Sequence, residues 1–171
     1  MPDYSYLRNI TPEQTIELAR EQTCQGIAWT YNEPTIWHEF SFDSAKLAKK
    51  AGLYTVYVSN GYINEDPLRE ISPFLDAINV DVKAFDDDFY EKVCKAHLEP
   101  VLKTCELAKE LDIHLEVTYL VIPGYNDSVD EVRQFCRWVV DKLGSITPVH
   151  FSRFHPDYRM TDVPMTPIET M

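Results

Sequence analysis

Short apolar segments that end in polar side chains recur along this sequence. The first runs from Ile27 to Trp29 and leads into Tyr31-Asn-Glu-Pro-Thr35, where Pro34 has no amide hydrogen and must end any β-ladder. The others are Tyr54-Thr-Val-Tyr-Val58 before Ser59-Asn-Gly61, Ala77-Ile-Asn-Val80 before Asp81 and Lys83, and Pro148-Val-His-Phe151 before Arg153 and His155. Polar groups at the carboxyl ends of successive strands, with helices between them, are typical of the active-site rim of an α/β barrel.

Helical patterns separate these segments. Thr11-Pro-Glu-Gln14 predicts a helix start with a capping box. Further helices are expected near 40–51, 66–75, 86–111 (with a break or a new start at Pro100) and 129–143. Strands separated by helices at intervals of roughly 25–35 residues indicate βαβ crossovers. We therefore expect five parallel strands in sequential order, near 27–31, 54–58, 77–83, 114–122 and 148–154, and a loop from 156 onward.

The predicted fold class is α/β, a partial (β/α) barrel of TIM type in a single domain over residues 1–171. A closed barrel needs about eight strands, so five would form an open arc with unpaired edges. The strand at 26–31 has no inward Lys and no Pro before position 34, so it lacks edge protection. The lead-in at 1–10 could cover this edge. Otherwise we expect the isolated chain to self-associate or to dissolve poorly.

Composition excludes several classes of partner. The net charge is −12 and no basic run is present, so nucleic acid and anionic membrane surfaces are not expected partners. No apolar run approaches the roughly 18 residues of a membrane span, and no signal peptide is visible. Cys24, Cys94, Cys105 and Cys136 form no Cys-x-x-Cys pair, so reduced and mostly buried thiols in a cytoplasmic protein are expected.

Each polar strand end has two interpretations. Glu33 is either a surface turn residue or a carboxylate that accepts hydrogen bonds from an ammonium group. Ser59-Asn-Gly61 is either a simple turn or a contact surface where Gly61 lets a ligand approach the backbone. Asp81 and Lys83, at i and i+2, leave the same face of a strand and form either an internal ion pair or a site for a zwitterionic or polyhydroxyl ligand.

Arg153 and His155 repeat the i, i+2 pattern at the end of the fifth strand. Tyr57, Tyr119 and the three Trp residues are expected in the core. Asp86 to Asp88 are interpreted as a solvated helix cap and not as a metal site.

Five motifs in register resemble one enzyme family. They are Thr30-Tyr-Asn-Glu-Pro-Thr35, Ser59-Asn-Gly61, Asn79-Val-Asp-Val-Lys83, Leu120-Val-Ile-Pro-Gly124 and Ser152-Arg-Phe-His-Pro-Asp-Tyr158. Together they resemble radical SAM enzymes related to pyruvate formate-lyase activating enzyme, in particular the AmmeMemoRadiSam system radical SAM protein. The resemblance covers the chain from about Thr11 to Met171. It implies an open (β/α)6 barrel that holds S-adenosylmethionine and a [4Fe-4S] cluster and generates a 5′-deoxyadenosyl radical.

The resemblance also implies roles for single residues. Glu33, with Asn32 beside it, lies in the motif that receives the methionyl amino group, and Ser59 and Asn60 lie near the cofactor. Asp81 matches the residue near the ribose, Lys83 the one near the methionyl carboxylate, and His155 a histidine near the adenine or the substrate. Val58 stands where the activating enzymes have Asp, so their cation site is not expected here.

The family signature Cys-x-x-x-Cys-x-x-Cys is absent from the sequence. No two of the four cysteines share a loop, so we expect the cluster ligands to lie upstream of this chain. The chain then corresponds to the central and C-terminal part of such a barrel, truncated at both ends and inactive alone. Two alternatives stay open: an aldolase-like barrel with a Schiff base on Lys83 and with Asp81 and Glu33 as acid and base, and a non-catalytic barrel fragment that acts as a binding subunit.

Overall fold

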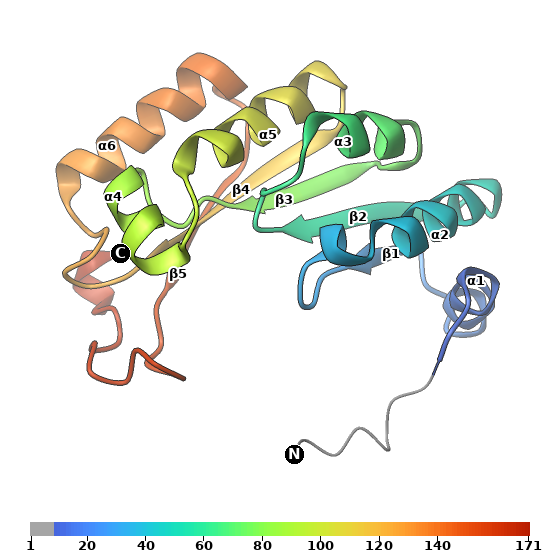
Figure 1. The fold of residues 1–171 in the computed structure, drawn as a ribbon, viewed down its shortest axis with the longest axis horizontal. Coiled ribbons are helices and arrows are strands. Elements are labelled where there is room, and N and C mark those ends of the chain that lie inside the picture. Colours follow the sequence, from blue (N-terminus) through green and yellow to red (C-terminus); the bar gives the residue numbers. More distant parts are fainter. Residues whose placement is uncertain (1–8) are drawn as a thin grey trace.

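The computed structural model describes residues 9–171, and one sheet of five parallel strands forms its centre (Figure 1). The strands are β1 (Gly26–Trp29), β2 (Tyr54–Ser59), β3 (Ala77–Asp81), β4 (His114–Val121) and β5 (Val149–Arg153). Each strand pairs in parallel with the next one in the sequence, so the spatial order is β1-β2-β3-β4-β5. The predicted α/β class and the sequential parallel order are confirmed. β1 ends before its predicted boundary because the chain turns ahead of Pro34.

Helices connect successive strands, as the pattern predicted. They are α1 (Pro12–Glu21), α2 (His38–Lys50), α3 (Glu65–Ile71), α4 (Asp87–Phe89), α5 (Leu98–Glu110) and α6 (Val129–Trp138). Short helical turns of other types adjoin them at η1 (Pro34–Trp37), η2 (Ser72–Phe74), η3 (Tyr90–Cys94) and η4 (Val139–Leu143), and η5 (Ile168–Thr170) lies in the final loop. The predicted capping box of α1 is confirmed, since Gln14 N donates to Thr11 Oγ1 and Thr11 N donates to Gln14 Oε1.

The predicted break at Pro100 is wrong by a few residues. The helical region ends at Cys94 because Lys95 adopts a left-handed conformation with φ of 57°, and α5 begins at Leu98. Pro100 therefore lies in the first turn of α5, where its missing amide hydrogen costs no helical hydrogen bond.

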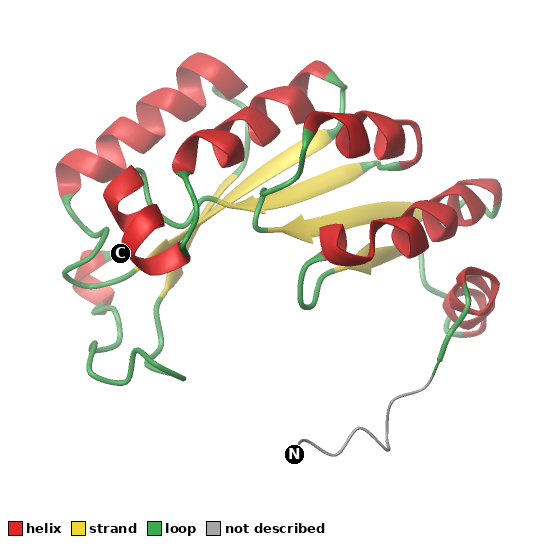
Figure 2. Ribbon diagram, in the orientation of Figure 1, coloured by secondary structure: helices red, strands yellow, loops and turns green. Residues whose placement is uncertain are grey.

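One face of the sheet is covered by helices and the other is not (Figure 2). Side chains alternate along the three central strands, β2 to β4, and those on the covered side are buried, among them Tyr57, Ile78, Val117 and Tyr119. Trp29 joins the same core, while Trp37 and Trp138 pack against it from its margin. The opposite face carries the more exposed half of these strands, which is apolar in β2 at Val56 and Val58 and polar in β3 at Asn79 and Asp81.

The sheet has two edges among the described residues. β1 pairs only with β2, and β5 pairs only with β4. Residues 1–8 of the lead-in that could cover β1 lie outside the described part of the chain, so the prediction of self-association stays open. At the other edge the final loop is held by Thr166, which is fully buried and donates its hydroxyl to Val121 O at 2.6 Å.

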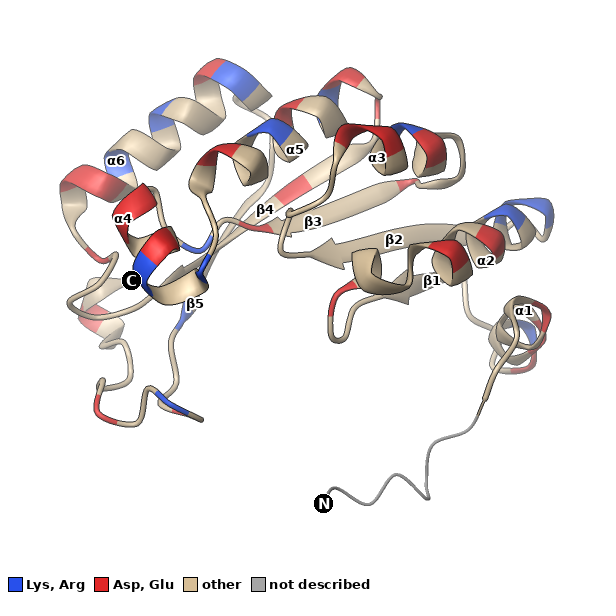
Figure 3. Cartoon of the chain, in the orientation of Figure 1, with Lys and Arg blue, Asp and Glu red and all other residues tan. Residues whose placement is uncertain are grey.

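The surface agrees with the predicted absence of a membrane span, but the exposure of the cysteines differs from the prediction. Acidic and basic residues both occur along the helices (Figure 3), and no described helix is long and apolar enough to span a membrane. The expectation of mostly buried thiols is wrong for Cys24 and Cys136, which are exposed. Cys24 follows the end of α1, and Cys136 lies on the outer face of α6. Only Cys105, on the inner face of α5, is fully buried.

Candidate functional site

Glu33 is the centre of a buried hydrogen-bond cluster at the carboxyl ends of β1 and β2. Its side chain is only 8% exposed, so the interpretation as a surface turn residue is wrong. Oε1 accepts from Ser59 Oγ at 2.8 Å and from Thr35 N and Oγ1 at 3.2 and 3.1 Å. Oε2 accepts from Asn60 N at 2.7 Å. We call Glu33, Thr35, Ser59 and Asn60 the Glu33 cluster; it ties the loop after β1 to the loop after β2.

The two carboxylate oxygens of Glu33 differ in whether they can accept a further hydrogen bond. Oε1 already receives three hydrogen bonds, whereas Oε2 receives one, from Asn60 N. A carboxylate oxygen offers about two lone-pair sites, so Oε2 can accept one more donor. Asn32, the other residue predicted in this motif, lies in the same turn and is exposed.

The segment Ser59-Asn-Gly61 is a turn, and its glycine has a packing role. Asn60 Oδ1 accepts from Tyr62 N at 2.8 Å, and Ser59 Oγ accepts from Gly61 N at 3.0 Å. Gly61 has φ of +75°, and a Cβ there would lie 2.7 Å from Val80 Cγ1 and 2.9 Å from Val101 Cγ1. The missing side chain of Gly61 therefore lets the loop pack onto β3 and α5, a role that sequence reasoning did not predict. The approach of a ligand to this backbone stays a prediction.

Asp81 and Lys83 lie at the carboxyl end of β3 and point to the same side, as the i, i+2 spacing predicted. Lys83 Nζ donates to Asp81 Oδ2 at 3.0 Å. The two side chains are 38% and 39% exposed. The ion-pair interpretation is thus correct, but both groups still reach solvent, so the pair also remains able to contact a ligand.

Two buried side chains and one partly buried side chain, which sequence reasoning missed, surround the backbone beyond Asp81. Tyr90 Oη accepts from Lys83 N, Asn126 Nδ2 donates to Lys83 O, and Glu131 Oε1 accepts from Phe85 N. Burial raises the pKa of Tyr90 well above its ordinary value, so its hydroxyl stays neutral. Asn126 lies two positions beyond the Leu120–Gly124 motif and resembles an ordinary turn residue, so no local signal in the sequence marked it.

Arg153 and His155 both lie at the carboxyl end of β5, but Arg153 is on the face of the sheet opposite Asp81. The register places Asp81 beside Thr118 and Thr118 beside His150, whereas Arg153 pairs with Val121 on the helix-covered side. Arg153 Nε donates to Thr166 O at 2.8 Å and so holds the final loop. His155 lies beyond the end of β5, at the predicted edge, and is exposed.

Two histidines, His114 and His150, share a sheet face with Asp81. His150 Nε2 lies 2.7 Å from Glu116 Oε2, and His114 Nε2 lies 3.4 Å from Glu116 Oε1. The hydrogen bond from His150 lowers the pKa of Glu116, and the contact with His114 adds to this shift. Alternation along β5 places His150 and Arg153 on opposite faces, but only the register of the sheet shows that His150 shares the face of Asp81.

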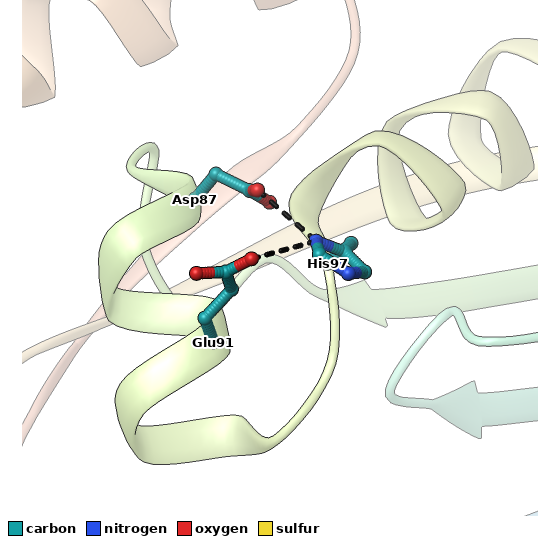
Figure 4. Close-up of side chains that lie close together, drawn as sticks. All are labelled: Asp87, Glu91 and His97. Carbon is teal, nitrogen blue, oxygen red and sulfur yellow. Dashed lines mark hydrogen bonds and ion pairs between the residues drawn. The ribbon is translucent and has the colours of Figure 1, made fainter.

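A group of titratable side chains lies apart from the sheet edge, at Asp87, Glu91 and His97 (Figure 4). It is the one group within residues 9–171 in which three such ligand atoms meet, and all three residues are exposed. Asp87 Oδ1 accepts from Leu98 N at 2.7 Å, and Oδ2 contacts His97 Nδ1 at 3.1 Å. These contacts lower the pKa of Asp87, and the bond to Asp87 raises the pKa of His97. An ion pair with a protonated imidazole accounts for this geometry.

The prediction for the acidic run before this group is confirmed as a helix cap. Asp86 caps α4 by accepting from Asp88 N at 3.1 Å. The described cysteines come together in no group of three, which agrees with their separation in the sequence.

Comparison with known proteins places this geometry in one family. Residues 2–138 match the profile of the Radical SAM superfamily. An uncharacterised protein of Methanocaldococcus jannaschii is 51% identical over 170 residues, which cover 99% of this chain and 50% of that protein. Pyruvate formate-lyase 1-activating enzyme of Escherichia coli K12 is 21% identical over 132 residues, which cover 76% of this chain and 53% of the enzyme. The chain belongs to the Radical SAM superfamily.

Solved structures show the same fold. A domain of pyruvate-formate lyase-activating enzyme from Bacteroides vulgatus superposes with a TM-score of 0.73 at 16% identity, over 85% of this chain and 87% of that domain. A radical SAM methyltransferase from Sphaerobacter thermophilus gives a TM-score of 0.68 at 15% identity, over 95% and 53% of the two chains. The chain spans about half the length of these two curated relatives.

Proposed function

We propose that the carboxyl edge of this sheet binds S-adenosylmethionine as part of a radical SAM enzyme of the activating-enzyme type. The observation that carries the proposal is the pairing of two sites on one edge: Glu33 with a free lone pair on Oε2, and the half-exposed pair of Asp81 and Lys83. Membership of the Radical SAM superfamily supports it, as do relatives that are named pyruvate formate-lyase activating enzymes.

The chemistry of these groups fits the cofactor. A carboxylate at Glu33 suits the methionyl ammonium, the ammonium of Lys83 suits the methionyl carboxylate, and Asp81 suits the ribose hydroxyls. Ser59 and Asn60 would orient Glu33, because both donate to its carboxylate. We assign Asn32 and His155 to the margin of the same site, on either side of it.

We further propose that the iron–sulfur ligands come from outside these 171 residues. The four cysteines are dispersed among a turn, two helices and the end of η3, so they do not fit a [4Fe-4S] cluster. When bound beside such a cluster, S-adenosylmethionine supplies a 5′-deoxyadenosyl radical for hydrogen abstraction. The residues of this chain bind and orient, and the chain alone is expected to lack the reaction.

Calorimetric titration of the 171-residue chain with S-adenosylmethionine tests the proposal. We expect saturable one-to-one binding that the double variant Asp81→Asn, Lys83→Ala weakens by at least about tenfold, since two charge-assisted hydrogen bonds are lost. The matched control is Lys103→Ala, which removes an exposed lysine paired with Glu99 on α5. Equal affinity in the double variant, or no binding at millimolar cofactor, would contradict the proposal. Trapping of a carbonyl compound on Lys83 by borohydride would favour the aldolase-like alternative instead.

We also propose that the chain self-associates through β1. The exposed pairing side of β1 supports this among the described residues, since β1 is bonded to β2 alone. Sedimentation at low micromolar concentration should show a dimer or larger species. A clean monomer whose amides at 27–29 exchange slowly would show that the edge is covered from within the chain.

A further inference from the structure

We propose that Tyr90 and Asn126 are positioning residues that hold the backbone of Lys83 and thereby direct its ammonium group to Asp81. The proposal deepens the proposed function, since it rests on Lys83 being part of the cofactor site. Its geometry is independent of that function, because every contact lies within this chain.

The need for such residues follows from where β3 ends. The last backbone hydrogen bond from this segment to β4 runs from Val82 N to Thr118 O at 2.9 Å. Beyond it the chain leaves the sheet, so a neighbouring strand no longer satisfies the backbone groups of Lys83. Side chains do so instead: Lys83 N donates to Tyr90 Oη at 3.0 Å, and Lys83 O accepts from Asn126 Nδ2 at 2.6 Å. Both backbone groups of this one residue are therefore held from opposite sides.

Asn126 has a single possible orientation. Its Nδ2 donates to both Lys83 O and Leu120 O, the latter at 2.8 Å, while its Oδ1 accepts from Ile122 N at 2.6 Å. A flipped amide would direct its oxygen at two carbonyl oxygens and its nitrogen at an N–H group. Because Asn126 is fully buried, water cannot replace these bonds. The end of β4 is thus joined to Lys83 through one side chain.

Two further contacts keep this segment in place. Glu131 Oε1 accepts from Phe85 N at 2.8 Å and from Tyr119 Oη at 2.8 Å. The backbone is thus held at positions 83 and 85, and the Lys83 side chain stays on the Asp81 side, where its Nζ donates to Asp81 Oδ2. An apolar core of the same shape would pack equally well but would not direct the Lys83 backbone.

The test compares two buried tyrosines. Tyr90→Phe removes the hydroxyl that accepts from Lys83 N, and Tyr57→Phe removes a hydroxyl that is bonded to Ser41 Oγ at 2.6 Å. The readout is the rate at which Lys83 is reductively methylated, measured by mass spectrometry against Lys103 in the same molecule. We expect Tyr90→Phe to increase the Lys83 rate by about two- to tenfold, the range for loss of one hydrogen bond, and Tyr57→Phe to leave it unchanged.

A second variant and a second readout complete the design. Asn126→Ala should raise the Lys83 rate at least as much, and Tyr90→Phe supplies the answer if Asn126→Ala does not fold. The affinity for S-adenosylmethionine should fall in Tyr90→Phe by a factor similar to the gain in reactivity.

The two proposals fail in different ways. If Tyr90→Phe loses as much stability as Tyr57→Phe but Lys83 reacts at the wild-type rate, Tyr90 is only structural and the inference is wrong. If the wild-type chain does not bind S-adenosylmethionine, the proposed function is wrong, while the methylation rates still decide whether Tyr90 and Asn126 position Lys83.

Discussion

The carboxyl edge of the sheet has two halves that use acidic side chains in different ways. After β1 and β2, the carboxylate of Glu33 is buried and accepts four hydrogen bonds from its own chain. After β3, the carboxylate of Asp81 is half exposed and bonds a single lysine, while neutral buried side chains hold the backbone around it. The Glu33 carboxylate joins the loops after β1 and β2, whereas the Asp81 carboxylate reaches solvent.

This difference predicts that Glu33 contributes to stability as well as to ligand binding, whereas the pair of Asp81 and Lys83 contributes mainly to ligand binding. A buried carboxylate that satisfies several donors is costly to remove, because each donor is left without a partner. An exposed ion pair contributes little to stability, so its loss should be felt mainly by a ligand. The following substitutions test that division, beginning with the one expected to have the largest effect.

Glu33→Ala should lower the free energy of unfolding by about 2–4 kcal/mol, because buried donors at Ser59 and Asn60 lose their acceptor. Urea denaturation measures the change. Glu39→Ala removes an exposed glutamate on α2 and should cost less than about 0.5 kcal/mol. Similar losses in the two variants would mean that the Glu33 cluster does not stabilise the edge.

Gly61→Ala should cost about 1–3 kcal/mol more than Gly52→Ala. Both glycines have φ of +75°, so the backbone strain is matched, but a Cβ meets Val80 and Val101 only at position 61. The comparison of unfolding free energies therefore isolates the close packing of the β2 loop. Equal costs would indicate that Val80 and Val101 move aside without penalty.

Asp81→Asn should change stability by less than about 1 kcal/mol yet weaken cofactor binding by about tenfold. The reason is that its ion pair with Lys83 is half exposed. Asp88→Asn, which breaks an exposed pair with Lys92, is the control and should alter neither quantity appreciably. A large loss of stability in Asp81→Asn alone would remove the distinction between the two halves.

His150→Gln should give the smallest effect, a rise in the pKa of Glu116 toward its ordinary value, followed by carbon-detected NMR titration. The folded-state pKa of Glu116 is lowered by His150, so the stabilisation is present above the unfolded pKa of about 4.3 and is lost as the pH falls through the folded value. The stability difference between wild type and variant should therefore shrink between about pH 5 and pH 3. His114→Gln, which removes a longer contact of 3.4 Å, should shift the pKa of Glu116 less. A larger shift in His114→Gln than in His150→Gln would show that His114 is the main partner of Glu116.

Much of the fold was accessible from local patterns. Apolar segments at regular intervals predicted five parallel strands in order, and the spacing of Asp81 and Lys83 predicted that they share a face. The capping box at Thr11 and Gln14 was also predicted from the sequence alone. These features depend on residues close together in the chain, where backbone geometry alone sets which side chains meet.

The features that failed or were missed depend on contacts between distant segments. Glu33 and Asn60 are 27 positions apart, and Lys83 and Asn126 are 43 apart. The register between β4 and β5 put His150, and not Arg153, on the face of Asp81. A period of two residues defines two faces of a strand but not which face turns toward the helices, because burial is set by the packing of the whole sheet. The local sequence thus predicted polar side chains at the carboxyl edge of the sheet. Only the assembled sheet determined that Glu33 is buried in a hydrogen-bond cluster while Asp81 and Lys83 form a partly exposed ion pair.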